Sequence, residues 1–274
     1  MIASPVGVHS IQGRMAPSRT AARSVWPEGR GASSGANTPG PLPVDTVRLR
    51  QIAEHDGIGI EFPEGSVFRN QAVGLAFQRF AQDSYRLQGV RANSDRIDSP
   101  RRATVALDIL GEAVPSVVPD MIANHYYPSV LGRYWRDSAF FEAKAVNGSI
   151  ALSSSRYQGV GLIDVAALSP LGRGDAPLAL VRPWPTVTFL TTSDTRIGPS
   201  LLAEATARRV EVRQAVAHEI LENWLVLAPS KSLDGNLFTL ALGITSFPNP
   251  PGLPGRLRRG SDTQNDPDPP RVEP

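Results

Sequence analysis

Between residues 68 and 80 the hydrophobic positions repeat with the period of an α-helix. Apolar residues recur there every three or four positions, at Phe68, Ala72, Leu75, Ala76 and Phe80. This spacing is typical of a helix that buries one face. We predict a helix over residues 66–86 with Ser66 as its N-cap, because a serine side chain can accept a hydrogen bond from an amide of the first turn.

Two later segments are expected to form neighbouring strands. Residues 114–118 are apolar and run into Pro119-Asp120, while residues 138–146 alternate in a two-residue period. A wide connection rich in tyrosine and tryptophan lies between them. Because successive side chains of a strand point to opposite faces, Glu142 and Lys144 should project together, with Ala143 on the other face.

The remaining pattern mixes helices and strands. The predicted elements are a loop over 86–102, a helix over 153–168 capped at its start by serine, a central strand over 186–192, a helix over 201–209, a strand or extended turn over 210–216 and a short helix over 218–227. This order predicts an α/β fold with a mixed central sheet flanked by helices.

Composition divides the chain into one domain and two arms. Residues 1–46 and 248–274 are rich in proline and glycine, without a sustained apolar period, and are expected to be disordered. The domain is expected over residues 47–247. No apolar run is long enough to span a membrane and the N-terminus lacks a classical signal peptide, so we expect a cytoplasmic protein when it is made.

Cysteine usage and charge narrow the chemistry. The absence of cysteine excludes a disulfide framework, a thiolate metal site and a cysteine nucleophile. The net charge of +2 permits nucleic-acid binding without requiring it. Of the 28 basic residues only Lys144 and Lys231 are lysines, so the other 26 are arginines. A lysine kept against that bias suggests a role that a compact ammonium performs and a flat guanidinium does not.

Asp120 and Glu142 are the best candidates for a metal site. Hydrolysis of a phosphodiester near neutral pH needs a divalent cation that activates water and neutralises charge, and hence converging carboxylates. Two neighbouring strands can bring these residues together, and the Ala143 carbonyl could add a ligand. Oxygen ligands suit Mg²⁺, for which Mn²⁺ can substitute, and Lys144 would orient the attacking water.

A Pro-Asp next to one strand and Glu-x-Lys within the next resembles the signature of the PD-(D/E)XK, restriction-endonuclease-like nuclease superfamily. The residues are Pro119-Asp120 and Glu142-Ala143-Lys144. The resemblance implies an αβββαβ core, with Asp120 and Glu142 as metal ligands and Lys144 as the catalytic lysine. It also implies that Gln158 supports the site. An additional acidic residue on the first helix is absent or displaced, with Glu64 just before that helix.

Within the superfamily, residues 142–164 resemble bacterial polymorphic-toxin nuclease domains. That resemblance implies a DNase effector, with DNA favoured over RNA as substrate, which a specialised system delivers into the cytoplasm of a competing cell. A cognate immunity protein would then be a partner. The alternatives are a restriction or repair nuclease of the same fold and a non-catalytic binding or adaptor module, in which the same charged residues form only surface pairs.

Three other features have plain structural interpretations beside functional ones. Gln158 is either an active-site contact or an ordinary first-turn helix residue. Aromatic and arginine residues between 126 and 136 either stack on bases or cover a sheet edge. His218 lacks a second histidine four positions later, because position 222 is Glu. A zinc-peptidase helix is therefore not expected, and His218 and Glu222 are interpreted as helix-surface residues.

Overall fold

The computed structural model describes residues 40–86, 89–95, 97–98, 116–128, 134–150, 158–168, 185–233 and 252–259. All of these belong to one compact unit, which begins at Pro39. Most of the expected N-terminal arm and the end of the expected C-terminal tail therefore lie outside the described residues. None of the helices within the described ranges is long and apolar enough to cross a membrane.

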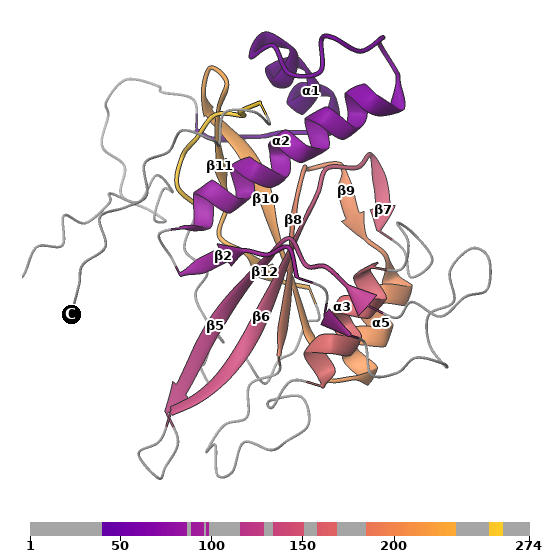
Figure 1. The fold of residues 1–274 in the computed structure, drawn as a ribbon, viewed down its shortest axis with the longest axis vertical. Helices are drawn as coiled ribbons and strands as arrows, with labels where there is room; N and C mark the ends of the chain where they lie inside the picture. The colour runs from indigo at the N-terminus through magenta and orange to yellow at the C-terminus, as the bar shows by residue number, and fades with distance from the viewer. Residues whose placement is uncertain are drawn as a thin grey trace, which may run out of the picture. The chain divides into compact units, whose positions relative to one another are not determined.

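A mixed sheet forms the centre of the fold, as the sequence predicts (Figure 1). In spatial order its main strands are β1 (Leu42–Pro43), β10 (Glu211–Leu221), β8 (Thr186–Thr191), β6 (Tyr134–Lys144), β5 (Met121–Pro128) and β2 (Val90–Ala92), and β11 (Trp224–Leu227) and β12 (Lys231–Ser232) also pair with β10. The strands β2, β5 and β6 are antiparallel, whereas β6, β8 and β10 are parallel. Two small ladders, β3 (Ile97–Asp98) with β4 (Ser116–Val117) and β7 (Gly148–Ile150) with β9 (Thr195–Ile197), accompany the sheet.

Helices cover both faces of this sheet (Figure 1). On one face lie α1 (Thr46–His55) and α2 (Val67–Tyr85), which share a core with Met121, Phe141 and Leu190. On the other lie α3 (Gln158–Ala167) and α5 (Pro199–Ala207), which pack with Phe140 and Phe189. The two cores meet through the strands, so each central strand is buried on both faces. The buried, β-branched composition of β8 fits its central place.

The helix predicted at 66–86 is present as α2, and the Ser66 side chain caps it by accepting from the Arg69 amide at 3.2 Å. Its predicted apolar face is partly wrong, because Phe68 and Leu75 are 63% and 54% exposed. The sheet supports only the later turns of α2, from Val73 onward. Phe68 instead lies against Phe62 in the preceding turn, with ring centroids 5.8 Å apart.

Three other local predictions are wrong. The first strand does not run up to Asp120, because among the described residues before it β4 ends at Val117, and β5 begins only at Met121. The wide connection is mostly a hairpin, since β5 and β6 stay paired out to Pro128 and Tyr134. The loop expected over 86–102 contains β2, which adds the edge strand of the sheet next to β5.

The helix expected over 218–227 is instead a strand, a turn and a strand. Strand β10 continues to Leu221 and pairs with β11 across a turn in which Asn223 has a φ of 60°. Asparagine tolerates this left-handed conformation better than most residues. His218 therefore lies on a strand, and Glu222 lies in the turn rather than on a helix surface.

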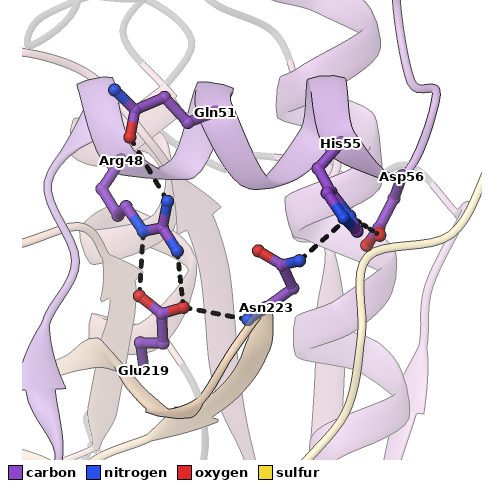
Figure 2. Close-up of polar contacts among 6 residues, drawn as sticks. All are labelled: Arg48, Gln51, His55, Asp56, Glu219 and Asn223. Atoms are coloured by element: carbon purple, nitrogen blue, oxygen red, sulfur yellow. Dashed lines mark hydrogen bonds and ion pairs between the residues drawn. The ribbon is translucent and has the colours of Figure 1, made fainter.

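Helix α1, which no pattern predicted, is fixed to this turn by polar contacts (Figure 2). Both carboxylate oxygens of Glu219 accept from the Arg48 guanidinium, at 2.7 and 2.9 Å. Glu219 also accepts from the Asn223 amide at 2.9 Å, and the Asn223 side chain lies 2.9 Å from His55 Nδ1. A two-point arginine–carboxylate pair fixes orientation as well as distance, so α1 has a defined place over β10 and β11.

Candidate active site

Asp120 stands where the β5–β6 ladder begins. The last antiparallel pair at this end is Met121 with Phe141, and Asp120 is the next residue before this pair. Its Oδ2 atom accepts a hydrogen bond from the Ala143 backbone N–H at 2.7 Å. Because this side chain takes a ladder position that a backbone carbonyl would fill, Asp120 is tied directly to the strand that carries Glu142 and Lys144.

Helix α2 and the segment after β2 hold Asp120 from its other sides. The Gln78 side-chain amide donates to Asp120 Oδ1 at 2.7 Å, and that of Gln82 donates to the Asp120 carbonyl at 3.2 Å. Asn93 donates from its backbone N–H to the Asp120 carbonyl and from its side chain to the Pro119 carbonyl, both at 3.0 Å. The aspartate therefore has a fixed conformation.

Glu142 and Lys144 form a close pair on the same face of β6, as the alternation predicts. The Lys144 Nζ atom lies 2.7 Å from Glu142 Oε1, and their side chains are 26% and 1% exposed, respectively. The residues on the opposite face, Phe141 and Ala143, pack in the core under α2. The glutamate is thus buried beside its lysine, while the lysine keeps some access to solvent.

Burial and mutual repulsion make this site unfavourable for negative charge. The pKa of Glu142 is raised to about 7, because burial, the largest cause, and the nearby Asp120 carboxylate together outweigh the opposing effect of Lys144. Burial also raises the pKa of Asp120, against the Ala143 N–H and Lys144. Burial by itself would lower the pKa of Lys144, but Glu142 and Asp120 raise it overall. The lysine therefore stays charged at neutral pH, and a further cation would stabilise the two carboxylates.

Asp120 and Glu142 supply oxygen ligands of the kind that a hard divalent cation takes. Asp120 and Glu142 lie close enough to perturb each other, and Mg²⁺ commonly takes one or two protein carboxylates while keeping several waters. In the part of the chain that the structure describes, no group of three or more His, Cys, Asp or Glu residues could hold a metal ion. At this site the side chains that could hold a cation are the two carboxylates of Asp120 and Glu142, and the Ala143 carbonyl belongs to the same stretch of strand.

Two other predicted residues remain to be placed, and only one of them has a described side chain. Gln158 is the first residue of α3, but its side chain lies outside the described residues. Glu64 is exposed in the turn before α2. Gln78, which contacts Asp120, lies eleven positions after the first residue of α2, which is roughly 16 Å along the axis at 1.5 Å per residue. The α2 side chain that contacts the Asp120 carboxylate is therefore an amide, that of Gln78, and not a carboxylate.

The end of β6 is fixed by a threonine that the sequence did not single out. The Thr195 hydroxyl accepts from the Val146 N–H at 3.1 Å and donates to the Val146 carbonyl at 2.7 Å. It also lies 2.9 Å from the Thr192 hydroxyl. These contacts hold the chain immediately after Lys144, which limits how far the lysine can shift.

The sequence contained a signal for one of these contacts. Gln78 and Gln82 are four positions apart, so they lie on the same flank of a helix and can reach one point together. That point, Asp120, is 42 positions from Gln78 in the chain.

Comparison of the chain with models of protein families, with curated proteins and with solved structures gave no match.

Proposed function

We propose that the protein is a metal-dependent nuclease of the PD-(D/E)XK type, which hydrolyses phosphodiester bonds. One observation carries the proposal: Asp120, Glu142 and Lys144 come together on adjoining strand ends, with the lysine 2.7 Å from a buried glutamate. A buried pair of carboxylates beside a charged lysine is costly for the fold. Such an arrangement is characteristic of a functional site, where buried charged groups bind a ligand.

The order of elements around the site supports the same proposal. In chain order α2, β2, β5, β6, α3 and β8 give αβββαβ, if the short ladders β3–β4 and β7–β9 are left aside. The proposed ligand Asp120 immediately precedes the second strand of this series, and Glu142 and Lys144 end the third. The sequence resemblance implies this series and this placement of the motif.

Each residue has a definite task in the proposed reaction. Asp120 and Glu142 would hold the cation, which when bound would supply an activated water and neutralise charge on the phosphoryl group. The Lys144 ammonium, kept charged by its carboxylate neighbours, would orient the attacking water and stabilise negative charge in the transition state. Gln78 and Gln82 would keep Asp120 from rotating, so that its carboxylate is in position to bind the cation before the substrate arrives.

Cleavage of plasmid DNA and of RNA by the purified chain, with and without Mg²⁺ or Mn²⁺, tests the proposal. We expect metal-dependent cleavage by the wild type and none by Asp120→Asn or Glu142→Gln. The matched control is Glu211→Gln, which removes another buried, ion-paired carboxylate, 2.9 Å from Arg213, and should still cut. Full cleavage by Glu142→Gln would refute the proposal.

A non-catalytic binding module is the alternative from another class. Calorimetric titration with Mn²⁺ separates the two, because a nuclease centre should bind the ion and lose binding on Asp120→Ala. A module whose charged residues form only surface pairs should bind no ion in either form.

The biological role proposed from the resemblance is that of an effector against competing bacteria, neutralised by a cognate immunity protein. Expression of the intact chain should then be toxic to bacteria, and expression of the Glu142→Gln variant should not. A restriction or repair nuclease of the same fold would instead be tolerated by its own host.

A further inference from the structure

A basic pocket of about 390 Å³ lies at the C-terminal end of α2, where residues 252–259 pass that helix. Its charged lining consists of Arg86, Arg256 and Arg258, opposed by the single carboxylate of Asp83. Phe80 contributes apolar wall. The lining therefore has an excess of positive charge, in a hollow large enough for a phosphate group together with part of its sugar.

The two later arginines stand on an anchored stretch of chain. Leu253 donates from its backbone N–H to the Ser84 carbonyl at 2.9 Å, and Gly255 exchanges two backbone hydrogen bonds with Leu225, at 2.8 and 2.9 Å. Leu257 is buried in the core. Figure 1 shows this segment beside β11 and the end of α2. Residues 252–259 are thus a fixed part of the domain, although the sequence predicted a solvated tail there.

The two arginines of this segment lie on the surface, on either side of a buried leucine. Leu257 is buried, whereas the flanking Arg256 and Arg258 are both exposed. Both line the same pocket. The Arg256 guanidinium also lies over the ring of Trp224, 5.7 Å from its centroid, and Trp224 is itself partly exposed. Arginines beside an exposed aromatic ring are the groups that hold the backbone and bases of a nucleic-acid strand.

The pocket and the candidate active site share helix α2. Gln82 donates to the Asp120 carbonyl, and Asp83 and Arg86, which line the pocket, follow within the next turn. The pocket and Asp120 therefore both adjoin the last turns of α2, and a strand that continues from the pocket round this end of the helix can reach Asp120.

We propose that this pocket binds backbone phosphates of the nucleic-acid substrate. The inference rests on the proposed function, since it assigns the pocket to the same substrate. Arginine is suited to the task because its guanidinium stays charged and donates two parallel hydrogen bonds to phosphate oxygens. The contact would position the strand and would be independent of its sequence.

The test is binding of a fluorescein-labelled oligonucleotide of mixed sequence to the full chain, in a chelating buffer that prevents cleavage. The variant is Arg256→Ala with Arg258→Ala. The control is Arg50→Ala with Arg209→Ala, which removes the same charge from exposed positions on α1 and after α5. Affinity is measured between about 50 and 200 mM salt. For a single strand, the slope of log affinity against log salt becomes shallower by about 0.7 for each phosphate that the protein no longer neutralises.

We expect the pocket variant to bind more weakly than the control pair, with a salt slope shallower by about 1.4, the value for two phosphates that are no longer neutralised. An unchanged affinity and slope, or an equal loss in the control pair, would overturn the inference. Displacement of the labelled strand by inorganic phosphate as readily as by unlabelled strand would also overturn it, because the pocket would then be a site for the free anion.

The binding test and the cleavage test can fail independently of each other. A chain that cuts DNA while its pocket variant binds normally would disprove the pocket and leave the nuclease assignment intact. A chain that binds through the pocket and cuts neither DNA nor RNA would disprove the nuclease and leave strand binding.

Discussion

Ionisation of Glu142 should make the metal-free protein less stable as the pH rises from 5 to 8. Burial raises the pKa of this carboxyl from 4.5 to about 7. Below about pH 4.5 it is protonated in both the folded and the unfolded chain and has no effect. Above that pH the unfolded chain releases the proton first, so folding loses free energy until the folded chain ionises near pH 7.

The magnitude follows from the difference between the two pKa values. At 1.36 kcal/mol for each pKa unit, a rise from 4.5 to about 7 corresponds to roughly 3 kcal/mol in full, of which roughly 2 to 3 kcal/mol falls between pH 5 and pH 8. For a domain of this size that is a decrease in melting temperature of about 5 to 10 °C. The glutamate is almost fully buried, so solvent screening does not reduce the effect.

Urea unfolding at pH 5 and pH 8, without metal and then with Mg²⁺, measures this effect. Glu142→Gln should lose the Glu142 part of the pH dependence, and Glu211→Gln should keep it. At pH 8 Mg²⁺ should stabilise the wild type and leave Glu142→Gln unchanged. If Glu142→Gln shows the same fall in stability from pH 5 to pH 8 as the wild type, the buried carboxylate is not the cause and the reasoning is refuted.

Two further predictions each compare a pair of substitutions, one pair at glycines in helices and one pair at buried threonines. Gly161→Ala on α3 should destabilise the fold by about 1 to 3 kcal/mol, because a Cβ atom there would overlap the Val117 side chain, whereas Gly74→Ala on α2, where the space is open, should stabilise it by up to about 1 kcal/mol. Thr195→Val should cost about 1 to 2 kcal/mol and slow cleavage, because two backbone groups after Lys144 lose their partner. Thr188→Val, whose buried hydroxyl has no hydrogen-bond partner in the described structure, should stabilise the fold by about 1 kcal/mol. Chemical unfolding measures the change in stability for both pairs, and plasmid cleavage measures the rate for Thr195→Val.

The local rules predicted those parts of the site that depend on neighbouring residues. Alternation along β6 placed Glu142 and Lys144 on one face, and the Ser66 cap located the start of α2. The position of Asp120 was predicted less well. Pro119 has no N–H to give to a ladder, and the Asp120 carboxylate replaces a backbone acceptor, so the strand begins after Asp120.

The rest depended on contacts between distant parts of the chain. The stretch from His218 to Leu227 contains leucine and glutamate, which favour helices, yet its pairing as β10 and β11 prevails because Asn223 turns the chain. The partners of Gln78 and of Arg48 lie 42 and 171 positions away. No periodicity within a window of ten or twenty residues contains that information.

The most direct test of the nuclease assignment compares the two lysines of the chain. Lys144 contacts Glu142 in the proposed site, whereas Lys231 is exposed on β12, so replacement of each by methionine removes the same charge from two different environments. We predict that Lys144→Met lowers metal-dependent plasmid cleavage by about 100-fold or more while the protein stays folded, and that Lys231→Met cuts at the wild-type rate. Cleavage by Lys144→Met at the wild-type rate would contradict the assignment.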